Sequence, residues 1–187
     1  MSSAFRKKLL VAALSCACLL VLAPGAWAQS SSNSGGAAFV PPPPPPAKGA
    51  LVDGRLVAPA SAPRRVKQVI TAANRIVEKP YRYGGGHTGY TSRRLDSGYD
   101  CSGAVSYALH GGRFLRSPLP SGMLMRWGQR GPGTWITVYA NAGHTYATIA
   151  GLRWDTSAAG YGSSKGPRWR ATMRPATGYA VRHADGL

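Results

Sequence analysis

The sequence is poor in cysteine, in acidic residues and in long apolar runs. Two of its three cysteines, Cys16 and Cys18, lie in the N-terminal apolar run of residues 9–22. If processing removes that run, Cys101 has no partner, which excludes an intramolecular disulfide framework. The run is also shorter than the roughly 20 apolar residues that span a bilayer as a helix. Six Asp and Glu stand against 23 Lys and Arg, so the formal net charge is +17.

Residues 1–28 are predicted to form a secretory signal peptide. Arg6-Lys7-Lys8 supplies the positive start, residues 9–22 supply the apolar core, and Ala26-Trp27-Ala28 places small residues at a cleavage site. The alternative is a retained membrane anchor. We therefore expect an exported protein, located in the periplasm, in the cell wall or outside the cell.

The composition of residues 29–63 predicts a disordered linker rich in Ser, Gly and Pro. Residues 41–46 are consecutive prolines, which favour a stiff polyproline II spacer. Such a composition buries too little apolar surface to offset the entropy of ordering the chain. The remainder, residues 64–187, has an ordinary size for one domain with one hydrophobic core.

This domain begins with helical patterns and ends with strand patterns. Apolar residues recur at helical spacing from Val66 to Val77, and Lys79-Pro80 should end that helix. A second helix is predicted from Cys101 to Gly111-Gly112. A helical turn is then expected at residues 121–127, followed by strands at 134–140, 144–150 and 153–156 and by weaker candidates at 168–170 and 178–182. Helices followed by strands predict an α+β domain with an antiparallel sheet.

Cys101 is the candidate nucleophile. It lies at the start of the second predicted helix, where the partial positive charge of the helix N-terminus favours a thiolate. Backbone N–H groups at the same helix end can stabilise an oxyanion on the carbonyl that the thiolate attacks. The alternatives are a buried, inert cysteine and an intermolecular disulfide.

A thiol nucleophile needs a histidine close in space as its base. His110 lies nine residues beyond Cys101 on the same helix, about half a turn away in net rotation and about 13.5 Å along the axis, so it faces away. His144 begins a predicted strand and is the favoured base. His87, which follows a glycine-rich loop, remains open, and His183 reads as a surface strand residue.

Asp155 is the candidate that orients the imidazole. If Ala150-Gly151 forms a two-residue hairpin loop, Tyr146 pairs with Asp155, and Asp155 then shares a sheet face with His144. A carboxylate in that place can accept a hydrogen bond from the imidazole. The alternative is a turn or cap residue ahead of Thr156-Ser157.

The motifs together resemble a known family. Pro80-Tyr81-Arg82-Tyr83-Gly84-Gly85, then Asp100-Cys101-Ser102-Gly103, then Gly143-His144 resemble the NlpC/p60 family of cysteine peptidases, over residues 66–182. The resemblance implies a papain-like α+β fold with N-terminal helices packed on an antiparallel sheet. It also implies cleavage of peptidoglycan stem peptides, usually between D-γ-glutamate and a diamino acid such as diaminopimelate.

The resemblance also assigns roles to single residues. Cys101 would be the nucleophile, His144 the base and Asp155 the third catalytic residue, at a position where the family often has His. For substrate binding it points to the following side chains: Tyr81, Asp100 and Ser102. Residues 128–139, rich in Gly and Arg, depart from the family pattern, and no repeated wall-binding module is present.

Partners and cofactors follow from charge and spacing. Removal of the signal lowers the net charge from +17 to +14, which favours wall polymers or lipopolysaccharide as polyanionic partners; no nucleic-acid motif is present. Cys101 and His144 are 43 residues apart without a further ligand at zinc-site spacing, so no metal or other cofactor is expected. We expect a monomeric peptidase. The competing readings are a non-catalytic peptidoglycan-binding module and an amidase or acyltransferase of the same fold.

Overall fold

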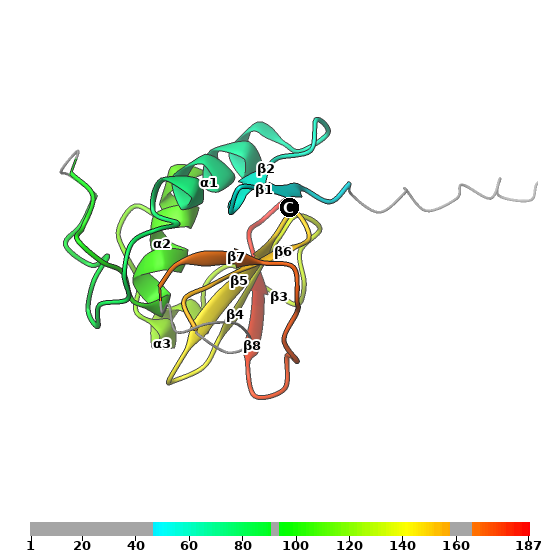
Figure 1. The fold of residues 1–187 in the computed structure, drawn as a ribbon. Coiled ribbons are helices and arrows are strands. Elements are labelled where there is room, and N and C mark those ends of the chain that lie inside the picture. The colour runs from blue at the N-terminus through cyan, green and yellow to red at the C-terminus, as the bar shows by residue number, and fades with distance from the viewer. Residues whose placement is uncertain (1–46, 91–93, 158–165) are drawn as a thin grey trace, which may run out of the picture. The chain divides into compact units, whose positions relative to one another are not determined.

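A computed structural model describes residues 47–90, 94–157 and 166–187 of the chain (Figure 1). Its elements in chain order are β1 (Ala50–Val52), β2 (Arg55–Val57), α1 (Arg64–Arg75), α2 (Cys101–Gly111), α3 (Ser121–Leu124), β3 (Gln129–Arg130), β4 (Ile136–Ala140), β5 (Thr145–Ile149), β6 (Leu152–Asp155), β7 (Arg168–Arg170) and β8 (Ala180–His183). Within residues 64–187 the expected order of helices followed by strands is confirmed, and so is the α+β class. The signal-peptide prediction lies outside the described residues.

Six of the strands form one antiparallel sheet in the order β3-β8-β4-β5-β6-β7. The loop between β5 and β6 consists of Ala150 and Gly151, both with positive φ (47° and 80°), as a tight two-residue hairpin requires. Ala147 pairs with Trp154 across this hairpin, so position 146 faces position 155. The two-residue loop expected from the sequence is therefore confirmed.

Helix α2 packs on β5 and β6 of the sheet, and α1 packs on α2 and on β2 (Figure 1). Alternate residues of β4, such as Ile136 and Val138, are fully buried in the core beneath the helices. Trp154 of β6 lies in the same core, and its Nε1–H donates to the carbonyl oxygen of Ala104 in α2 at 3.1 Å. This contact ties the helix that begins at Cys101 to the strand that ends at Asp155.

Residues 47–63 correct the prediction of a disordered linker, because the chain is already folded there. β1 and β2 form a hairpin around Asp53 and Gly54, which both have positive φ. Leu56 is buried in the core, and Asn74 of α1 bonds both the N–H and the C=O of Leu56. The prediction was wrong because composition masked an Asp-Gly turn between apolar residues. Residues 29–46 lie outside the described part.

Two smaller differences concern element ends. α1 ends at Arg75, ahead of the Lys79-Pro80 stop, and Gln129–Arg130 forms a short edge strand that alternation did not predict. No helix in the described ranges is long and apolar enough to cross a membrane.

Candidate active site

Cys101 is the first residue of α2, and Asp100 caps the helix in front of it. The Asp100 carboxylate accepts a hydrogen bond from the N–H of Gly103 at 2.7 Å, which is the usual N-cap bond. A side chain on Gly103 would overlap the carbonyl of Gly85, so this glycine lets the glycine-rich loop pack against the first helical turn. The two motifs of the sequence are therefore joined in space at the start of α2.

His144 and Asp155 meet as strand parity predicted. The Nε2 atom of His144 lies 2.9 Å from Oδ1 of Asp155; the aspartate side chain is fully buried and the imidazole is 21% exposed. The turn that precedes His144 also fixes its backbone, since the N–H of His144 donates to Oδ1 of Asn141 at 2.8 Å. Because Nε2 is bonded to Asp155, Nδ1 is the ring nitrogen left for the thiol of Cys101.

The protonation of both groups follows from these contacts. Burial of the imidazole opposes its charge, but hydrogen bonding to Asp155 and to Cys101 outweighs that effect and raises the pKa of His144 from 6.5 to about 9. Burial would raise the pKa of Asp155, yet hydrogen bonds from His144 and Ser157 hold it well below its ordinary value. His144 is therefore protonated at neutral pH and can donate a proton beside the sulfur of Cys101.

Asp155 also has partners that the sequence analysis did not assign. Ser157 donates its N–H to Oδ1 and its hydroxyl to Oδ2, both at 2.9 Å. Arg174 Nη1 donates to Oδ2 at 3.2 Å, and Arg153 Nε lies 3.3 Å from the same oxygen without hydrogen-bond geometry. Ser157 could have been found from its two-residue spacing, which suits an Asx turn. Arg174, 19 residues away in a loop, carries no such signal.

A second histidine–aspartate pair lies on the other side of Cys101. His87 Nε2 is 3.1 Å from both Asp100 Oδ1 and Ser102 Oγ, and Ser102 donates to the same carboxylate oxygen at 3.0 Å. Oδ2 of Asp100 accepts from the N–H of Gly84 at 3.0 Å. Asp100 and Ser102 are both buried and are occupied by partners within the chain. Their contact with a substrate stays a prediction.

Tyr81 lies beside the nucleophile. Its backbone forms a parallel bridge with Tyr99, just ahead of the Asp100-Cys101 step. Partial burial, followed by the negative charges of Cys101 and Asp100, raises the pKa of its hydroxyl, which stays protonated and able to donate. The structure therefore brings all six predicted site residues together around one helix end: Cys101, His144, Asp155, Tyr81, Asp100 and Ser102.

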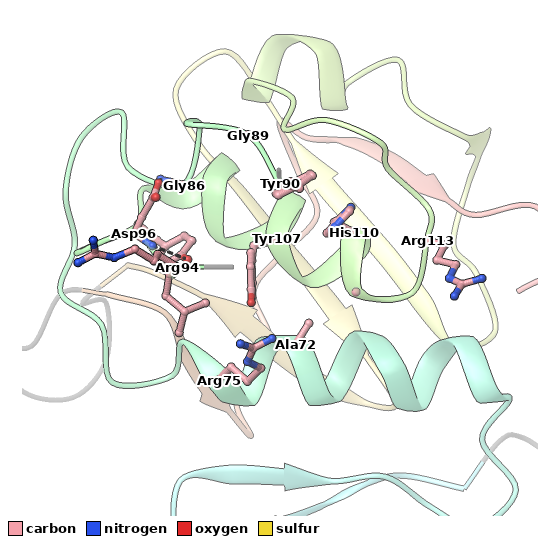
Figure 2. Close-up of a pocket in the computed structure, with 13 residues that line it drawn as sticks. Ala72, Arg75, Gly86, Gly89, Tyr90, Arg94, Asp96, Tyr107, His110 and Arg113 are labelled. Atoms are coloured by element: carbon pink, nitrogen blue, oxygen red, sulfur yellow. Dashed lines mark hydrogen bonds between the residues drawn. The ribbon is translucent and has the colours of Figure 1, made fainter. Parts of the chain in front are cut away.

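The remaining histidines lie elsewhere, as predicted. His110 Nδ1 donates to the Leu115 carbonyl oxygen at 2.9 Å, and the ring stacks on Tyr90 at 3.8 Å between ring centres. His183 on β8 donates from Nδ1 to the Gly131 carbonyl oxygen at 3.1 Å. His110 lines a cavity of about 520 Å³ between α1, α2 and the loop ahead of α2 (Figure 2). No predicted site residue lines that cavity, so it is separate from the candidate active site.

No metal site accompanies this arrangement in the described part of the chain. Within residues 47–90, 94–157 and 166–187, no group of three His, Cys, Asp or Glu side chains could hold an ion. The set of Cys101, His144 and Asp155 is instead suited to nucleophilic chemistry: a thiol, a base beside it and a buried acid that orients the base.

Comparison with known proteins gives no family assignment: no family model matches the chain, and no curated protein does either. Solved structures that resemble it include a hypothetical invasion protein of Mycobacterium tuberculosis, at 23% identity and a TM-score of 0.44, covering 73% of this chain and 69% of that one. Two variants of the resuscitation promoting factor interacting protein RipA have TM-scores of 0.44, at 23% and 22% identity, over 73% and 74% of this chain and 69% and 70% of theirs.

Proposed function

We propose that this protein is a cysteine peptidase that hydrolyses stem peptides of peptidoglycan, with Cys101, His144 and Asp155 as its catalytic residues. The observation that carries the proposal is the position of His144, between a buried carboxylate 2.9 Å away and the thiol at the start of α2. The cell-wall substrate rests on the motif resemblance, and the bond between D-γ-glutamate and the diamino acid is its finer form.

The first half of the reaction forms an acyl enzyme. The Cys101 thiolate attacks the peptide carbonyl, and the negative oxygen is stabilised by N–H groups of the first turn of α2. Asp100 already accepts from the N–H of Gly103, which leaves the N–H groups of Cys101 and Ser102 for that role. His144, protonated in the resting site, donates its proton to the leaving amine, and the C–N bond breaks.

The second half releases the acid. Neutral His144 takes a proton from a water molecule, which attacks the thioester carbonyl and restores the Cys101 thiolate and the imidazolium. Asp155 holds the ring through Nε2 in both halves, and the bonds from Ser157 keep the carboxylate in place. Tyr81, whose hydroxyl pKa is raised by burial and by the charge of Cys101, is the further residue that we propose contacts the bound substrate.

Digestion of purified peptidoglycan tests the proposal. The wild-type protein should release new amino groups, whereas Cys101→Ser should release none above background. His183→Asn, which removes a histidine on β8 away from the site, should cut like the wild type. Mass spectrometry of the soluble fragments then identifies the bond that is cut.

The competing functions predict other outcomes. Sedimentation of both wild type and Cys101→Ser with peptidoglycan, without cleavage by either, would establish a binding module in place of a peptidase. Fragments that carry a new bond to an added amine would indicate an acyltransferase, and release of whole stems from the glycan would indicate an amidase.

Export and wall polymers complete the proposal. The basic charge of +14 for residues 29–187 suits a location among anionic wall polymers or lipopolysaccharide. Expression of the full chain followed by N-terminal sequencing of the secreted product should find cleavage after Ala28. Recovery of uncleaved chain in the membrane fraction would favour the anchor.

A further inference from the structure

The polar surroundings of Asp155 are left incompletely bonded. Five buried side-chain nitrogen or oxygen atoms in the described residues lack a hydrogen-bond partner, and three of them lie near Asp155: Tyr146 Oη, Arg153 Nε and Arg170 Nε. Buried polar atoms are nearly always bonded, so such a concentration calls for an explanation. The group is on β5, β6 and β7, at one edge of the sheet (Figure 1).

Strand register places these side chains on the face that carries Asp155. Arg153 precedes Asp155 by two residues and pairs directly with Arg170 of β7, so the two arginines are neighbours on one face. Arg170 Nη2 donates to the Ser157 carbonyl oxygen at 2.6 Å, and Arg174 Nη1 donates to the Ser157 hydroxyl at 3.2 Å. Three guanidinium groups therefore converge on residues 153–157.

One carboxylate balances these three charges. In the described residues Asp155 forms ion pairs with Arg153 and Arg174, and Arg170 is the cross-strand neighbour of Arg153. The eight residues of 158–165, between β6 and β7 in the sequence, include no Asp or Glu. Arg153 is only 3% exposed, and its own pKa is lowered by burial and by the charges of Arg170 and Arg174, despite Asp155. Arg170 and Arg174, which are only partly buried, therefore add positive charge beside a buried arginine, and a bound anion would offset that charge.

The position of the excess charge relative to His144 selects the part of the substrate. His144 donates its proton to the leaving amine, so the leaving residue lies on the His144 side of Cys101. Arg174 and His144 both contact the carboxylate of Asp155, and the Arg174 side chain is 28% exposed. Arg174 also lies over the Tyr146 ring at 5.4 Å, which holds it on this side of the site.

We propose that Arg170 and Arg174, backed by buried Arg153, form an anion subsite that binds a free carboxylate of the leaving residue of the substrate. This inference rests on the proposed peptidase function and adds a requirement to it. The preferred substrate has a diamino acid that carries a carboxylate beyond the one in the main chain, as diaminopimelate does, and a guanidinium fork binds that group in a bidentate manner.

Matched peptides test the subsite. Two stem peptides are compared that differ only in the side-chain carboxyl of the leaving diaminopimelate, which is free in one and amidated in the other. We expect the wild type to cut the free acid with a kcat/KM about 10- to 100-fold higher, the range of a charged hydrogen bond. Arg170→Gln should bring this ratio close to one, mainly by raising the KM of the acid.

Arg174→Gln should lower the same ratio and also lower kcat for both peptides, since Arg174 contacts Asp155. Arg130→Gln, an exposed charge change on edge strand β3, should leave the ratio unchanged. Thermal melts show whether each variant is folded. An equal rate on both peptides, or a preference that survives in folded Arg170→Gln, overturns the subsite.

Binding separates this inference from the proposed function. Calorimetry with Cys101→Ala measures the affinity for the two peptides without cleavage. If the wild type cuts neither peptide, the peptidase proposal fails. The subsite would still be supported if Cys101→Ala binds the free acid more tightly than the amide and the double variant with Arg170→Gln does not. Equal binding of both peptides by Cys101→Ala would overturn the subsite.

Discussion

Two histidine–aspartate pairs flank the same cysteine, and they differ in what else holds the aspartate. Asp155 is fully buried and orients His144, whose second nitrogen is left for Cys101. Asp100 caps α2 and holds His87, whose ring nitrogen is shared with Ser102. None of the contacts of His87 in the described chain is to Cys101. Both pairs consist of the same residue types, so residue type alone does not identify the base. The base is identified by the contact of the histidine with Cys101.

Replacement of His144 should have the largest effect on activity. His144→Ala removes the group that protonates the leaving amine, and we expect kcat to fall by a factor of about 10⁴. Peptidoglycan cleavage measured by amino-group release, with the folded state checked by circular dichroism, gives the number. A loss of less than tenfold would assign the base elsewhere, with His87 as the next candidate.

Asp155→Asn should have the next largest effect. The substitution keeps the size of the side chain but removes the charge that favours protonated His144, so we expect a loss of about 10²- to 10⁴-fold in kcat. The same change leaves Arg153 and Arg174 without their carboxylate. Steady-state kinetics on a stem peptide check it, and near-wild-type activity would exclude Asp155 as the orienting residue.

The pH dependence of activity and stability tests the protonation of His144. The pKa of His144, about 9 in the folded protein, lies above its value of 6.5 in the unfolded chain. Its contribution to the free energy of unfolding is thus complete below pH 6.5 and is lost as the pH rises through about 9. We expect kcat/KM to fall above pH 9, and in Asp155→Asn to fall at a lower pH. An NMR titration of His144 that gave an ordinary pKa would contradict this.

Asp100→Ala tests the second pair through stability. Loss of the N-cap should lower the free energy of unfolding by about 1–2 kcal/mol. The bonds from Gly84 and Ser102 to the same carboxylate are lost with it. Urea denaturation measures the change. A destabilisation of a few tenths of a kcal/mol would mean that the cap contributes little.

His87→Asn should give the smallest effect. Among the described residues its ring bonds Asp100 and Ser102, the cap and the second residue of α2, so we expect kcat to change by less than about threefold while stability falls slightly. The variant is the direct control for His144→Ala. A loss approaching that of His144→Ala would place His87 in the chemistry.

Much of the site was predictable because its parts are local. Asp100 ahead of Cys101 marks a helix start through an N-cap bond that spans three residues. The hairpin at Ala150-Gly151 sets the parity that joins His144 to Asp155 across 11 residues. The hairpin at Asp53-Gly54 carried the same kind of signal, but the surrounding composition concealed it.

Local patterns of residues thus specify the helix that begins at Cys101, the antiparallel strands and the same-face position of His144 and Asp155, since turns, caps and periodicity act over a few residues. Three contacts became known from the folded chain: His144 reaches a cysteine 43 residues away, Arg174 bonds Asp155, and His87 bonds Asp100. Such contacts depend on how α2 packs against β5 and β6 and on where the loops cross, which no local pattern encodes.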